Sequence, residues 1–100
     1  MEATIKLEIK DNTFAQQFET KVESGIISVE YSIQEKKLFL TKINVPKDYN
    51  DEEFITNFLK NIMEIAIEKK ARVVPIHPKI VVFFKKNPIY KELLPAGIRI

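Results

Sequence analysis

Apolar and polar residues alternate along the first half of the chain, and a period of two residues is typical of half-buried β-strands. Turn-forming residues separate the alternating segments, and the polar segment 34–37 is expected to form a hairpin loop. The pattern predicts strands over residues 4–9, 14–22, 26–33 and 38–45, with turns at 11–13 and at Ser24-Gly25.

The fourth predicted strand carries apolar residues on both of its expected faces. Strict alternation places Leu38 and Leu40 on one face. The same alternation places Phe39, Ile43 and Val45 on the other face. A strand that is apolar on both faces is typical of the interior of a sheet, so we expect it to be covered on two sides.

The second half of the chain changes to apolar residues at intervals of three and four. This spacing over residues 51–70 predicts a long amphipathic helix. Residues 72–76 predict a short strand, and residues 78–86 predict a second helix that Asn87-Pro88 ends. The C-terminal segment is expected to hold a turn and a last strand.

A helix between two strands predicts a βαβ crossover, which makes the strands 38–45 and 72–76 parallel neighbours. The fold class expected from this order is α+β with an α/β-like crossover. Its sheet is mixed and mainly antiparallel. At 100 residues, the length predicts a single domain over residues 1–100.

Composition narrows the classes of function. The chain is 45% hydrophobic and 30% charged, and its 16 Lys+Arg against 14 Asp+Glu leave a net charge of +2, too small to indicate a nucleic-acid partner. It has no cysteine and one histidine, His77, so we expect no disulfide and no metal site. The absence of a signal peptide or a long apolar run predicts a cytoplasmic protein without a membrane partner.

The turn between the fourth strand and the long helix is rich in acids. Asp48, Asp51, Glu52 and Glu53 lie within six residues, and no glycine lies among them. Carboxylates in a first helical turn complement the helix dipole by about 0.3–1 kcal/mol each. We expect Asn50 to be the N-cap, because Glu53 three residues later completes the spacing of a capping box.

Several motifs between residues 44 and 93 occur in an order that is similar to a known family. The matching residues are, in chain order, Val45, Pro46, Tyr49, Val73, Val74, Pro75, Phe84, Lys86, Asn87, Pro88, Tyr90 and Leu93. Together they resemble the small GCN5-related N-acetyltransferase (GNAT)-like family, which has a reduced GNAT fold. Tyr31 takes the position of a family tyrosine, and the resemblance covers residues 13–94.

The resemblance implies a cofactor and a site. The family fold binds acetyl-CoA in a V-shaped opening between its two parallel strands and transfers the acetyl group to an amine. The pyrophosphate sits on the turn after the first of these strands, here residues 46–53. The resemblance therefore implies cofactor-binding positions at Val45, Asn50, Asp51 and Glu53.

This sequence departs from the family at those positions. Asn50 stands where the family turn has Arg or Gln, and Asp51 and Glu53 stand in place of its two glycines. The glycines allow pyrophosphate to approach backbone N–H groups at a helix N-terminus. We therefore expect an acetyl-CoA-dependent N-acetyltransferase-like protein whose acetyl-CoA binding is weak or lost. The alternative is a non-catalytic protein-binding or structural module with a protein partner.

The catalytic candidate is His77. It follows Pro75, where members of the family often have a cysteine, and a neutral imidazole could act as general base for the acceptor amine. The alternative is a hydrogen-bonding role at the start of the helix 78–86. Tyr31, Tyr49 and Tyr90 could supply a phenol to a leaving thiolate, and the alternative for each is packing at the end of an element.

Overall fold

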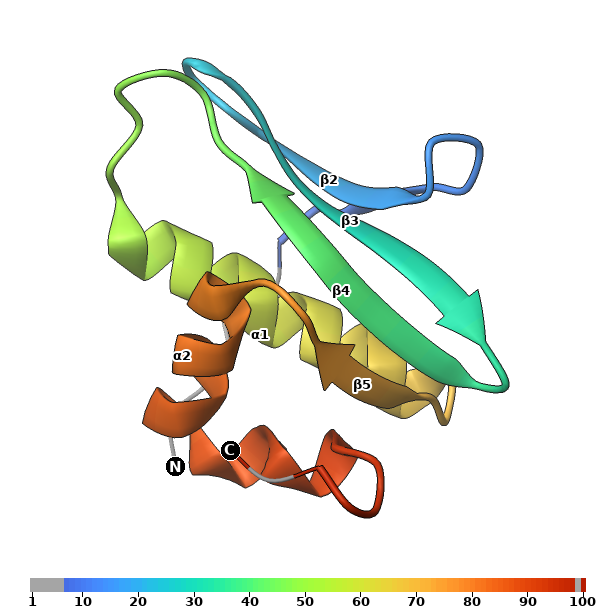
Figure 1. The fold of residues 1–100 in the computed structure, drawn as a ribbon. Helices are drawn as coiled ribbons and strands as arrows, with labels where there is room; N and C mark the ends of the chain where they lie inside the picture. Colours follow the sequence, from blue (N-terminus) through green and yellow to red (C-terminus); the bar gives the residue numbers. More distant parts are fainter. Residues whose placement is uncertain (1–6, 99) are drawn as a thin grey trace.

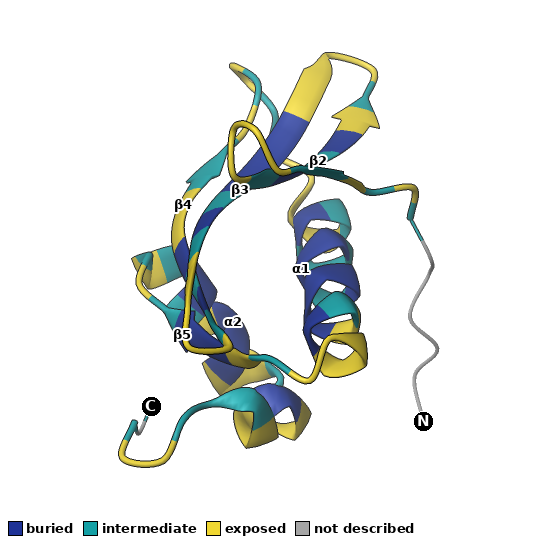
Figure 2. Cartoon of the chain, turned by 90° about the vertical axis from the view of Figure 1, so that its right-hand side faces the viewer, coloured by how far each residue is buried: buried dark blue, intermediate teal, exposed yellow. Residues whose placement is uncertain are grey.

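The computed structural model describes residues 7–98 and 100, and shows a five-stranded sheet with a long helix across one face (Figures 1 and 2). The strands are β1 (Lys10–Asn12), β2 (Gln17–Val22), β3 (Gly25–Gln34), β4 (Lys37–Asn44) and β5 (Arg72–Pro75). The helices are α1 (Glu52–Glu68), α2 (Pro78–Lys86) and the 3-10 helix η1 (Pro88–Leu93).

The sheet is mixed and mainly antiparallel, as the sequence predicts. Its strand order is β1-β2-β3-β4-β5, in which the first three pairs are antiparallel and β4 pairs with β5 in parallel. The helix α1 connects the two parallel strands, so β4–α1–β5 is the expected βαβ unit. The predicted α+β class with a crossover is confirmed.

The N-terminal strand was predicted in the wrong place. Residues 4–6 lie outside the described residues, and 7–9 form no strand. The amide of Leu7 instead donates to the Asn61 side chain at 3.0 Å, and the carbonyl of Glu8 accepts from the Thr20 hydroxyl at 3.1 Å. β1 begins at Lys10 and pairs with β2, so the loop falls at 13–16 rather than at 11–13.

The β3–β4 hairpin turns through two residues, Glu35 and Lys36. Both have positive φ, 50° and 64°, as a type I′ turn requires. The ladder closes on the pair Gln34 and Lys37, so the predicted polar hairpin loop is confirmed.

A bulge at Thr41 changes the face of the sheet to which the side chains in the second half of β4 point. The register pairs Leu38 with Ile33, Leu40 with Tyr31 and Ile43 with Val29. Leu40 and Ile43 are three residues apart, whereas their partners in β3 are two apart, so one residue of β4 is extra. Ile43 therefore shares the face of Leu40 and packs against the core, so its predicted place on the opposite face, with Phe39, was wrong. Phe39 lies on the opposite face and is half-buried.

The core lies between the sheet and α1. Apolar side chains at three- and four-residue spacing on α1 are buried, among them Ile55, Phe58 and Ile62. They pack against the inner face of β2, β3 and β4, as Figure 2 shows by its dark band of buried residues. α2 adds Ile80 and Phe84, both fully buried, and thereby ties the C-terminal third to the same core.

The C-terminal segment contains no strand in its described part. Residues 88–93 form η1, in which Tyr90 stacks on Phe83 of α2 with ring centroids 5.7 Å apart. The predicted last strand is therefore wrong: Pro88 and Pro95 lack donors, and η1 packs on α1 and α2. Within residues 7–98 and 100, no helix combines the length and apolar character that crossing a membrane requires.

Candidate functional site at the fork between β4 and β5

The two parallel strands separate after a short ladder. β4 and β5 pair only from Lys37 with Arg72 to Leu40 with Pro75. The carbonyl of Leu40 then accepts from the amides of Ile76, at 3.0 Å, and His77, at 3.3 Å. Beyond this point β4 continues beside β3 to Asn44, while the chain after β5 turns into α2. We call this divergence the fork.

The bulge lies at the fork, and one exposed apolar side chain follows each of its two strands. Thr41, the extra residue of β4, comes directly after the last paired residue and donates its hydroxyl to the carbonyl of Glu30 at 3.2 Å. Val45 follows β4 and Ile76 follows β5, and their exposed fractions are 40% and 52%. The carboxyl end of a parallel pair is where α/β proteins usually bind ligands.

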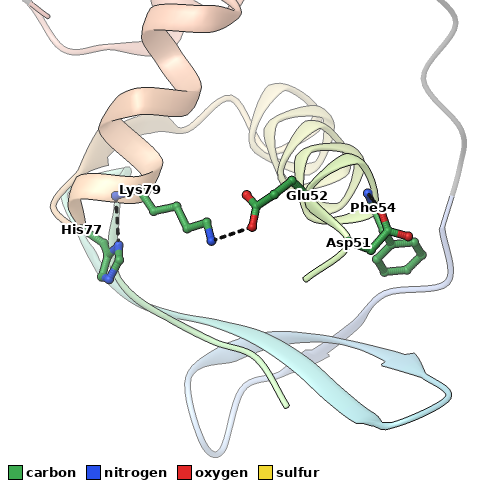
Figure 3. A network of polar contacts seen from close by, with 5 residues as sticks. All are labelled: Asp51, Glu52, Phe54, His77 and Lys79. Atoms are coloured by element: carbon green, nitrogen blue, oxygen red, sulfur yellow. Dashed lines mark hydrogen bonds and ion pairs between the residues drawn. The ribbon is translucent and has the colours of Figure 1, made fainter. Parts of the chain in front are cut away.

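The turn that follows β4 ends in a helix cap made by Asp51. The backbone of Pro46 accepts from the amide of Tyr49 at 3.0 Å, and Asp48 adopts a φ of 65° within this turn. The Asp51 carboxylate accepts from the amide of Phe54 at 3.1 Å, which makes Asp51 the N-cap of α1 (Figure 3). The predicted cap at Asn50 is therefore wrong by one residue.

That shift also removes the predicted capping box. With the cap at Asp51, the third helical position is Phe54 rather than Glu53, and a phenyl ring has no acceptor to return a hydrogen bond. Glu52 and Glu53 keep the other expected role, since both lie in the first turn of α1.

His77 caps the second helix at the fork. Its Nδ1 accepts from the backbone amide of Lys79 at 3.1 Å, and Pro78 occupies the first position of α2. A neutral imidazole that accepts at Nδ1 carries its proton on Nε2. In this arrangement the ring can donate a hydrogen bond from Nε2 to a ligand. To act as a general base, the ring would have to accept a proton at Nδ1, and the hydrogen bond from the Lys79 amide would first have to break.

An ion pair links the starts of the two helices. Lys79 of α2 extends toward Glu52 of α1, and its Nζ lies 3.1 Å from Oε2 of that carboxylate (Figure 3). The two residues are 27 apart in the sequence, so only the fold brings them together. Both are partly exposed, which limits the stability that this pair adds to at most about 1 kcal/mol.

The same pair borders a cavity of about 250 Å³ between α1 and α2. Its lining residues are Glu52, Ile55, Thr56, Leu59, Lys79, Val82, Phe83, Lys86 and Asn87. The floor is apolar, and the rim holds two cations and one carboxylate. A slender ligand with an anionic group fits this chemistry, provided that Lys79 is released from Glu52.

The three tyrosines have different environments. Tyr31 lies in the core, where its hydroxyl donates to Asp11 at 2.5 Å, and burial with this hydrogen bond raises its pKa to about 12. Tyr90 packs on Phe83, away from the turn. Tyr49 lies on the turn near Asp51. Burial of its hydroxyl is the larger cause, and the negative charge of Asp51 the smaller, of a raised Tyr49 pKa. Of the three, Tyr49 is therefore the one that lies on the turn between β4 and α1, whereas Tyr31 pairs with Leu40 at the fork but has its hydroxyl bound to Asp11.

Comparison with known proteins assigns the fold. One solved structure, of a GCN5-like candidate N-acetyltransferase from Staphylococcus aureus, matches with a TM-score of 0.69 over 93% of this chain and 91% of that chain. The fold is GNAT-like. Sequence identity over the match is 16%, so the likeness concerns the architecture. No family model matches this chain, and a search of curated proteins finds no match either.

In this GNAT-like fold, the predicted site residues lie around one fork but have different roles. Val45 and His77 follow the two parallel strands, and Asp51 starts α1. Asn50 precedes the cap and is exposed, as is Glu53. Sequence reasoning missed the Thr41 bulge and the Glu52–Lys79 pair, because neither has a signal in local spacing.

Proposed function

We propose that this protein is an N-acetyltransferase-like protein with a GNAT fold whose acetyl-CoA binding is weak or lost. The observation that carries the proposal is the hydrogen bond from the Phe54 amide to Asp51 at the start of α1. A bound pyrophosphate needs free amides at such a helix start. Here a carboxylate of the chain already accepts from one of them.

Charge supports the same proposal. Asp51, Glu52 and Glu53 are exposed at the start of α1, and Asp48 precedes them on the turn. Two like charges at contact distance repel by about 1 to 4 kcal/mol, depending on the local dielectric. Lys79 reaches this helix start but is paired with Glu52 and so is withdrawn from an incoming phosphate, and Lys47 on the turn is outnumbered by the four acids.

Calorimetric titration with acetyl-CoA tests the proposal. The wild type is expected to bind at millimolar concentration or not at all. The double variant Asp51→Gly/Glu53→Gly removes two charges and frees the Phe54 amide, and adding Asn50→Arg supplies a cation. Both variants are expected to bind more tightly than the wild type, and the triple variant more tightly than the double.

Asp51→Asn is the matched control, because an amide side chain keeps an acceptor for the Phe54 amide while it loses the charge. It is expected to gain less affinity than the double variant with glycines. Micromolar binding of acetyl-CoA by the wild type would overturn the proposal, and transfer of acetyl to an amine substrate would then be assayed. Without binding in any variant, the fork serves as a structural element of a non-catalytic module.

A further inference from the structure

The opposite end of the parallel strand pair carries two cations side by side. Lys37 is the first residue of β4 and Arg72 is the first residue of β5, and the two are direct partners in the parallel register. The next pair, Leu38 and Val73, is buried in the core. Since successive side chains of a strand alternate, Lys37 and Arg72 both project from the opposite face of the sheet.

Neither of these cations has a carboxylate partner in the described part of the chain. No carboxylate of residues 7–98 or 100 forms an ion pair with Lys37 or Arg72. Like charges on adjacent strands repel, so the arrangement costs stability unless an anion lies between them. Lys36 and Lys70 on the neighbouring loops are exposed and add to the positive field, which Glu35 in the same hairpin turn offsets in part.

The two cations line an open depression of about 540 Å³ with Leu94, Pro95 and Ala96. That volume is within the range of small-molecule sites and exceeds what an inorganic ion needs. Arg72 is also held in place, because its Nη1 donates to the carbonyl of Glu92 at 2.6 Å. The other guanidinium N–H groups remain able to bind an oxyanion.

We propose that Lys37 and Arg72, with the apolar wall of residues 94–96, form a binding site for a small organic anion, an apolar group that carries a phosphate or a carboxylate. The guanidinium and the ammonium would hold the anionic group, and Leu94 with Pro95 would cover the apolar part. The site lies four residues of β4 from the fork, roughly 13 Å at 3.3 Å per residue. It does not rest on the function proposed for the fork.

Amide chemical-shift titration of the ¹⁵N-labelled protein tests this site with three probes: inorganic phosphate, phenyl phosphate and benzoate. We expect shifts centred on Lys37, Arg72 and Ala96. At least one aromatic probe should bind about tenfold more tightly than inorganic phosphate, and comparison of the two aromatic probes distinguishes a phosphate from a carboxylate headgroup.

Variants locate the binding. Lys37→Gln and Arg72→Gln are each expected to weaken it by about tenfold or more, and Lys37→Arg to retain it. Lys85→Gln, on an exposed position of α2, is the matched control and should change nothing. Equal binding of all three probes, shifts spread over the surface lysines, or undiminished binding in the double variant Lys37→Gln/Arg72→Gln would each overturn the proposal.

Discussion

At the scale of single residues, the start of α1 depends on one carboxylate. Asp51 accepts from the Phe54 amide at 3.1 Å, whereas Asn50 precedes the cap. Asp51→Ala is therefore expected to lower the free energy of unfolding by about 0.5–2 kcal/mol. Asn50→Ala is the control and should change it by less than about 0.5 kcal/mol. Urea denaturation of both variants checks the assignment, which fails if Asn50→Ala proves the more costly.

Tyr31 gives the fold a dependence on alkaline pH. Burial and the hydrogen bond to Asp11 raise its pKa from the ordinary 10 to about 12. Because the folded state favours the protonated phenol, this contribution is fully present below pH 10 and is lost as the pH rises through 12. The loss amounts to roughly 1 to 3 kcal/mol.

Denaturation of the wild type and of Tyr31→Phe between pH 9 and pH 12 measures that contribution. The variant keeps the ring that packs on Phe18 but cannot ionise. Its free energy of unfolding should fall less steeply over this interval, although lysines and the other tyrosines titrate in both proteins. Parallel curves for the two proteins would show that Tyr31 ionises alike in the folded and unfolded states.

At the scale of elements, α1 ends in a Schellman motif with an unfavourable residue. The amide of Ala71 donates to the carbonyl of Ala66 at 2.9 Å, and that of Lys70 donates to Ile67 at 3.1 Å. Lys70 has a φ of 56°, where a side chain is strained and glycine is not. Lys70→Gly is expected to raise the melting temperature, through a gain of about 0.5–1 kcal/mol.

Lys70→Ala is the control for that gain, because it removes the same charge but keeps a Cβ. It should leave the melting temperature near that of the wild type or below it. If alanine stabilises as much as glycine, relief of charge repulsion rather than of backbone strain is the cause.

Local patterns predicted most elements, and the misses have physical reasons. The period of α1 and the proline at the start of α2 located both helices to within two residues. The bulge at Thr41 could not be predicted. The face of the sheet to which each side chain points is inferred from strict alternation, and an extra residue breaks that alternation. The segment 7–9 alternates like a strand, but its polar backbone groups bond to the side chains of Asn61 and Thr20.

At the scale of the whole molecule, the fold could be predicted more fully than the site. The order of strands and helices, with its βαβ unit, followed from periodicity. The GNAT-like architecture that the solved structure shares was implied by the resemblance of the motifs in residues 44–93 to that family. The cap at Asp51 was missed by one residue, since Asn50 and Asp51 are both good caps. The Glu52–Lys79 pair joins positions 27 apart and emerges only when β4 and β5 are paired.

The Glu52–Lys79 ion pair allows the effect of a substitution on acetyl-CoA binding to be separated from its effect on the free energy of unfolding. Glu52→Gln removes one acid from the start of α1 and releases Lys79, whose Nζ lies 3.1 Å from the carboxylate. Because the pair is partly exposed, the free energy of unfolding should fall by no more than about 1 kcal/mol. Affinity for acetyl-CoA should rise, by about tenfold, since a repelling charge is lost and a cation is freed.

Glu64→Gln is the matched control, because Glu64 is exposed on the same helix, about three turns from Glu52. It should leave acetyl-CoA binding unchanged. Salt dependence adds a second check. The Debye screening length is about 8 Å at physiological ionic strength and is shorter at higher salt, so the gain in affinity from Glu52→Gln should shrink in 0.5 M sodium chloride. If Glu52→Gln binds no better than Glu64→Gln at low salt, then the Glu52–Lys79 pair does not limit access of acetyl-CoA to the start of α1.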